Sequence, residues 1–142
     1  MQSAVFQNLF DSKDIRDLPK RQMQAVMAAR FCIICHKVGR EPVEDLSIRF
    51  RSIPAAKAFV NLMSAIGKVW PEPFAIMRPC CSAVSVDELV LSAMVGAEAS
   101  RDRQEFDAAL EDMIDAKART TLFDATVIFA ASFNPLPIIG SK

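Results

Sequence analysis

The stretch that decides the predicted fold is residues 19–38, PKRQMQAVMAARFCIICHKV. Apolar side chains recur in it every three or four residues, which is the period of an α-helix. Pro19 suits the first turn of a helix, and Gly39 suits the left-handed residue that follows the last turn. The sequence therefore predicts a long helix from Pro19 to Val38.

This predicted helix has apolar residues on two opposite faces. One face carries large side chains: Met23, Met27, Phe31, Ile34 and Val38. The opposite face carries mainly small side chains and ends on the histidine: Ala25, Ala28, Ala29, Cys32, Cys35 and His36. A helix that is apolar on both faces is expected in the middle of a helical bundle, where small residues let a neighbouring helix approach closely.

Two more helices are marked by local signals. A helix from about Pro54 to Trp70 carries an apolar stripe and ends where prolines follow Trp70. Ser85 and Glu88 have the spacing of a capping box, in which a serine caps a helix and a glutamate three residues later bonds back to it. This pattern predicts a third helix that runs to about Ala99.

The C-terminal part of the chain carries further helical signals. Asp102 and Glu105 repeat the capping pattern and predict a fourth helix, with these residues facing inward: Phe106, Leu110, Met113 and Ile114. Segment 120–133 is apolar nearly all round, so it is either a continuation of that helix or a fifth, buried one. Segment 46–51 alternates between apolar and polar residues but has no second strand to pair with, so we expect an extended loop or a short helix.

No repeat, low-complexity tract or linker divides the chain. We therefore expect residues 1–142 to form one all-α domain, a helical bundle of about five helices.

The charges of the chain balance, with 17 basic and 17 acidic residues. Nucleic-acid binding normally needs a basic face, so we expect no nucleic-acid partner. No apolar stretch reaches the ~18 residues of a membrane span, and the N-terminus lacks a signal-peptide pattern, so we expect a cytoplasmic protein with no membrane partner. Apolar residues nevertheless make up 51% of the chain, which predicts leftover apolar surface and hence self-association or a protein partner.

The chain's only histidine stands beside two of its four cysteines, in Cys32-Ile-Ile-Cys35-His36. Positions 32, 35 and 36 share one face of a helix, so two thiols and an imidazole converge on one patch. Zinc or iron would need one further ligand, and Cys80 or Cys81 is the candidate to supply it. The sequence therefore allows a metal site built from these five residues.

The cysteines have three other interpretations. Cysteine packs as a small hydrophobe, so Cys32 and Cys35 can simply fill a close contact between helices. Cys80 and Cys81 precede a helix and are the better placed pair for thiol-redox chemistry. The motif Cys-x-x-Cys-His also resembles the attachment signature of c-type haem, which implies thioethers to both thiols and His36 as axial ligand. That resemblance covers only three residues and is not accompanied by an export signal.

Asp124 is the only ionisable side chain between Arg119 and the last residue of the chain. An unpaired carboxylate is costly to bury, so we expect one of two environments. Asp124 either forms a buried polar site with Arg30 or His36, or caps a helix break near residue 120. It is also, with water, an alternative fourth ligand for the metal site.

No motif in the sequence defines a reaction. The chain has no glycine-rich phosphate loop, and no serine stands in the strand-turn-helix setting of a hydrolase nucleophile. We therefore expect an interaction or assembly protein, with metal binding and thiol-redox chemistry as the alternatives.

Overall fold

The computed structural model describes residues 14–100 and 102–133, and within them the chain is helical and contains no strand. The elements are a short 3₁₀ helix and six α-helices: η1 (Ile15–Asp17), α2 (Lys20–Lys37), α3 (Val43–Phe50), α4 (Ile53–Val69), α5 (Val86–Ser100), α6 (Arg103–Leu110) and α7 (Ala116–Phe133). The predicted all-α bundle is confirmed. Most of the alternating segment 46–51 lies in α3, which is the short-helix alternative.

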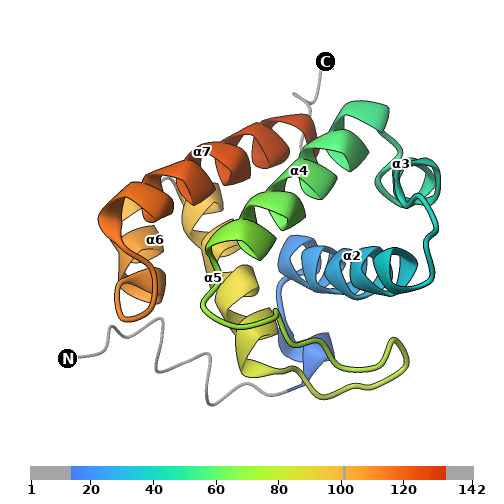
Figure 1. The fold of residues 1–142 in the computed structure, drawn as a ribbon, viewed down its shortest axis with the longest axis horizontal. Helices are drawn as coiled ribbons and strands as arrows, with labels where there is room; N and C mark the ends of the chain where they lie inside the picture. The colour runs from blue at the N-terminus through green and yellow to red at the C-terminus, as the bar shows by residue number, and fades with distance from the viewer. Residues whose placement is uncertain (1–13, 101, 134–142) are drawn as a thin grey trace.

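Figure 1 shows α4 and α7 side by side, with α3 next to the start of α4. Helix α5 packs against α2, α6 and α7. An aromatic cluster joins α3, α4 and α7: the ring centroids of Phe59 and Phe129 lie 5.1 Å apart, and Phe50 lies 5.7 Å from the first and 5.5 Å from the second. Edge-on or tilted rings at these distances add to the stability that their burial provides.

Helix ends fall where local signals in the sequence predict them. The N–H of Glu88 donates to Ser85 Oγ (3.0 Å) and the N–H of Ser85 donates to the Glu88 carboxylate (2.9 Å), which completes the capping box of α5. The Asp102 carboxylate accepts a hydrogen bond from the N–H of Glu105 (3.1 Å) and caps α6. Gly39, which follows α2, has a φ of +73°.

Helices α6 and α7 are separate. Helix α6 ends at Leu110, and residues 111–115 form a turn. The Asp115 carboxylate accepts a hydrogen bond from the N–H of Ala118 (2.8 Å) in the first turn of α7. Segment 120–133 is therefore part of a separate helix and does not continue α6. Residues 113 and 114 lie in the turn, so the prediction that placed them on the fourth helix is wrong.

The small-residue face of α2 is buried as predicted, except for His36 at its end, which is exposed. Ala25, Ala29 and Cys35 are among its buried residues. Helix α2 comes close to α5 at Gly96, where an added Cβ would lie 2.7 Å from Nε2 of Gln22. The absence of a side chain at Gly96 thus leaves room for the Gln22 amide beside α5.

The position predicted for α2 in the middle of the bundle is wrong, because its large-residue face is not enclosed. Four of the five large side chains are only partly buried: Met23, Met27, Phe31 and Ile34. The fifth, Val38, is 70% exposed. The buried alanines and cysteines of α2 lie on its small-residue side, whereas Met23 and Met27 are only partly covered by a cluster that includes Leu89 and Ala93 of α5.

None of the described helices is long and apolar enough to cross a membrane.

Candidate functional site

The structure divides the Cys32-Ile-Ile-Cys35-His36 motif between the core and the surface. Cys32 and Cys35 are buried, with Cys32 in the main hydrophobic cluster, whereas His36 is exposed. Burial raises the pKa of the Cys32 thiol to about 11, and the neighbouring Cys35 contributes to the same shift. At neutral pH Cys32 is therefore a protonated thiol, which is neither a good nucleophile nor a ready metal ligand.

The second cysteine pair lies in the loop between α4 and α5. Cys80 is exposed, Cys81 is partly buried, and all four cysteines of the chain are free thiols. Across residues 14–100 and 102–133, no three His, Cys, Asp or Glu side chains are grouped so that they could hold a metal ion. The structure thus does not bring either loop cysteine together with Cys32, Cys35 and His36, and the zinc or iron site stays a prediction.

Asp124 is exposed in the middle of α7, so the prediction of a buried polar site at this residue is wrong. The buried side of α7 carries Leu122, Thr126 and Phe129. At 100° per residue Asp124 falls on the opposite side of the helix, where water solvates the carboxylate. The alternative of a cap at a break near residue 120 is also wrong, because α7 is continuous there.

Among the residues that the structure describes, the buried charges lie elsewhere, in a pair that the sequence did not reveal. Arg30 of α2 and Glu88 of α5 are 1% and 0% exposed. Arg30 Nε lies 2.8 Å from Oε2 of Glu88 and a terminal guanidinium nitrogen lies 3.0 Å from Oε1, so the contact is bidentate. Charge-assisted bidentate pairs of this kind are among the strongest side-chain hydrogen bonds.

Arg30 and Glu88 also anchor the loop of residues 70–85. The remaining guanidinium N–H groups of Arg30 donate to carbonyl oxygens of the loop, in the residues Arg78, Pro79, Cys81 and Ala83. Glu88 accepts hydrogen bonds from the N–H groups of Met77 (3.0 Å) and Ser85 (2.9 Å). The buried ion pair thereby ties several points of a long loop without regular structure to α2 and α5.

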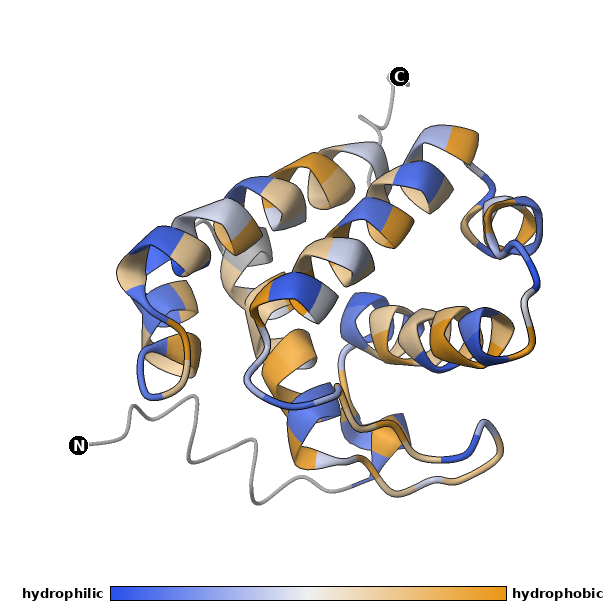
Figure 2. Ribbon diagram, in the orientation of Figure 1, coloured by the Kyte–Doolittle hydropathy of each residue, from blue (hydrophilic) through white to orange (hydrophobic). Residues whose placement is uncertain are grey.

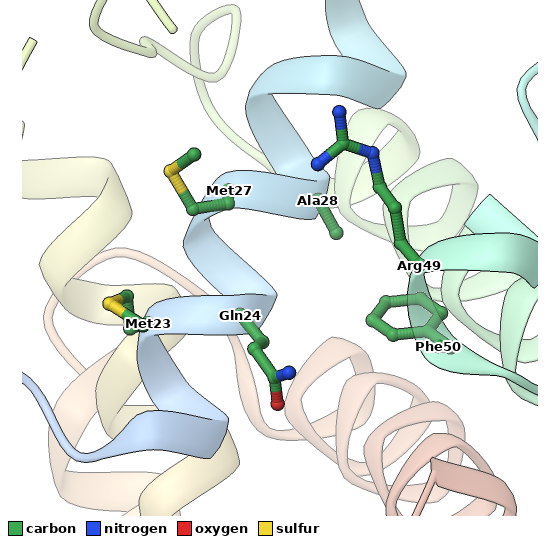
Figure 3. Close-up of a pocket in the computed structure, with 6 residues that line it drawn as sticks. All are labelled: Met23, Gln24, Met27, Ala28, Arg49 and Phe50. Carbon is green, nitrogen blue, oxygen red and sulfur yellow. The ribbon is translucent and has the colours of Figure 1, made fainter. Parts of the chain in front are cut away.

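A surface cavity of about 240 Å³ lies between α2 and α3. Six residues line it: Met23, Gln24, Met27, Ala28, Arg49 and Phe50. Figure 3 shows Arg49 and Phe50 reaching from α3 towards α2. Pockets for drug-sized ligands usually measure ~300–1,000 Å³, so this α2–α3 cavity is better matched to one or two side chains of a partner than to a metabolite.

Arg49 is the only charged residue among those that line the cavity. Its guanidinium carbon lies 4.9 Å from the centroid of the Phe31 ring, in a cation–π contact. Within the part of the chain that the structure describes, Arg49 belongs to none of the ion pairs. A cation without a carboxylate partner thus stands beside an apolar surface.

The cavity continues into the large-residue face of α2, which we call the outer face: Met23, Met27, Phe31, Ile34 and Val38. Figure 2 shows that hydrophobic segments alternate with hydrophilic ones along α2. The sequence signal for this surface was present, because the wheel places these five residues together. What the sequence did not reveal is that, among residues 14–100 and 102–133, no helix encloses them.

The fold and the outer face together define the class of this protein. It is an all-α helical bundle in which one apolar face of a helix is partly exposed. Comparison of the chain with protein-family models, with curated proteins and with solved structures finds no match. Function is therefore inferred from the chain's own residues.

Proposed function

We propose that this protein is an interaction or assembly protein that binds a protein partner through the outer face of α2. One observation carries the proposal: α2 is apolar on two faces, and the fold buries most of one face but leaves the large side chains of the other partly exposed. Contiguous apolar surface that a chain leaves open is typical of sites where another molecule docks. Methionine side chains suit such a role because they are flexible and adapt to different partners.

The apolar area of the outer face that is still exposed limits the free energy that a partner can gain by covering it. Full burial of a large apolar side chain is worth ~1.5–3 kcal/mol, and four of the five outer-face residues are already partly covered. Covering the rest of the face is then worth at most about 3–6 kcal/mol, because only the exposed part of each side chain remains to be buried. Association itself costs ~4–15 kcal/mol, so apolar contact alone gives weak binding. A stable complex needs an additional specific contact, and Arg49 is placed to provide one.

Site-specific photocrosslinking tests the proposal. A photoreactive amino acid replaces Met27 on the outer face or, as the control, exposed Lys117 at the start of α7, which Figure 1 shows at the other end of the molecule from α3. We expect crosslinked products of discrete mass, in the cells that express the protein, from position 27 and not from position 117. Products from both positions in equal yield, or from neither, would contradict the proposal.

A further inference from the structure

We infer that the occupant of the outer face is an acidic amphipathic helix of a partner protein, with an apolar anchor in the α2–α3 cavity and a carboxylate on Arg49. This inference rests on the proposed function and names the chemistry of the partner. It follows from the shape of the surface, from its charge and from the position of Arg49.

The shape of the surface fits a helix. The outer face runs from Met23 to Val38, sixteen residues whose fifteen steps rise ~22 Å along the axis of α2. An amphipathic helix of about four turns covers that length and presents apolar side chains at i, i+4 and i+7. The cavity, whose lining includes Met27 and Phe50, is a recess for one such anchor.

The charge around the surface favours an acidic occupant. The chain has no Asp or Glu between Leu18 and Arg40. Two of the basic residues in this segment are neutralised within the fold, because Arg30 pairs with Glu88 and Arg40 pairs with Asp45 (2.7 Å). Lys20 and Lys37 remain exposed at the two ends of α2. An acidic helix laid along the outer face would meet a positive charge at each end.

The same charges disfavour a second copy of this chain. In a twofold contact the same patch faces itself, so the basic residues of α2 would meet the basic residues of the other α2. Helix α2 offers no acidic residue to compensate them. Like charges that face each other across an interface are unfavourable, whereas opposite charges also speed association.

Arg49 supplies the specific contact. Its guanidinium lies at the edge of the cavity, over Phe31, and forms no ion pair with any described residue. Arginine presents a planar fork that binds a carboxylate through two parallel hydrogen bonds. A Glu three or four residues from the apolar anchor of the bound helix is on the same side of that helix and within reach of Arg49.

The test uses labelled peptides of about 16 residues that place Leu at i, i+4 and i+7. One peptide carries Glu at its flanking positions, a second carries Lys there, and a third has the composition of the first in scrambled order. Fluorescence anisotropy with the full chain at low salt measures the dissociation constants. We expect the Glu peptide to bind at least about tenfold more tightly than the other two, and its affinity to fall as salt rises.

Charge-reversal variants locate the binding. We expect Arg49→Glu to weaken binding of the Glu peptide at least about tenfold, and Lys20→Glu to weaken it by a smaller factor. Lys117→Glu, a matched reversal of an exposed cation on α7, leaves it unchanged. Because these side chains are partly or fully exposed, each variant should keep the parent circular-dichroism spectrum. Chemical shifts of α2 and α3 amides should move on titration with the Glu peptide.

Equal binding of the Glu and Lys peptides, or binding that Arg49→Glu does not change, would overturn the inference. Self-association of the free chain that Met27→Glu abolishes would overturn it too, because a second copy would then be the occupant. So would binding to anionic lipid vesicles but not to the Glu peptide. If position 27 still crosslinks to a protein in any of these cases, the interaction role stands and only the acidic-helix partner is wrong. If position 27 gives no product, the proposed function fails as well.

Discussion

The buried pair of Arg30 and Glu88 makes a sharp stability prediction for the isosteric variant Glu88→Gln. Each carboxylate oxygen of Glu88 accepts two N–H groups: Oε1 from Arg30 and Ser85, and Oε2 from Arg30 and Met77. Glutamine keeps the shape but turns one oxygen into an NH₂ donor. Whichever way the amide is turned, that donor faces two other donors, and the Arg30 charge stays buried without a counter-charge.

The expected cost follows from the loss of one partner of a buried ion pair, which destabilises a protein by ~3–5 kcal/mol. This range already includes the cost of leaving other groups unpaired, so it also covers the N–H groups of Ser85 and Met77. A single domain has only ~5–15 kcal/mol of stability, so the variant should fold but unfold much more easily. With a urea dependence of ~2 kcal/mol per molar, the urea midpoint should fall by about 2 M.

Urea unfolding followed by circular dichroism measures this shift, with Asp45→Asn as the matched control. Asp45 pairs with Arg40 at 2.7 Å, but the two side chains are 31% and 65% exposed. An exposed pair is worth ~0–1 kcal/mol, so the control should move the midpoint by less than about 0.5 M. If Glu88→Gln moves the midpoint no more than Asp45→Asn does, the reasoning about the buried network is refuted.

Three further predictions concern single residues. Arg51, which ends α3 with a φ of +57°, should gain ~0.5–1 kcal/mol of stability on replacement by Gly, whereas Gly39→Ala, at a φ of +73°, should lose a similar amount; urea midpoints of both variants check this. Exposed Cys80 should react with a thiol reagent in the native protein at pH 8, while Cys32 should react only after unfolding, as mass spectrometry of labelled peptides would show. Because folding raises the pKa of Cys32 to about 11, its protonated thiol favours the folded state, so this contribution is full below the unfolded pKa of ~8.5 and disappears as pH rises through about 11. The free energy of unfolding should therefore fall more steeply over that pH window in the parent than in Cys32→Ala; equal slopes would count against the burial of this thiol.

Helix ends were predictable from the sequence because their causes are local. The capping box of Ser85 and Glu88 and the left-handed Gly39 each depend on residues within one turn of the helix end. The boundary between α6 and α7 had a comparable signal, since Asp115 caps the N–H of Ala118. That signal was missed because the apolar spacing continued through the turn.

The buried charges were not predictable, because their causes are non-local. Arg30 and Glu88 are 58 residues apart in the chain, and Glu88 was already explained by its role in the capping box. The rarity of charge near Asp124 suggested burial, but the helical wheel opposes Asp124 to Leu122 and Phe129, and that geometry decides its exposure. Wheel geometry was thus a better guide to burial than the rarity of charged neighbours.

The ion pair also bears on why the outer face of α2 points outward. Hydrophobicity alone does not fix the rotation of a helix that is apolar on both faces, because either face can pack inward. Turning α2 by half a turn would bury Met27 and Phe31, but it would carry Arg30 away from Glu88 and from the loop carbonyls. A buried polar pair that selects one of two apolar packings is the role in which such pairs are best attested. The contact between Arg30 and Glu88 therefore favours the packing in which the alanines and cysteines of α2 face inward and its large apolar residues stay partly exposed.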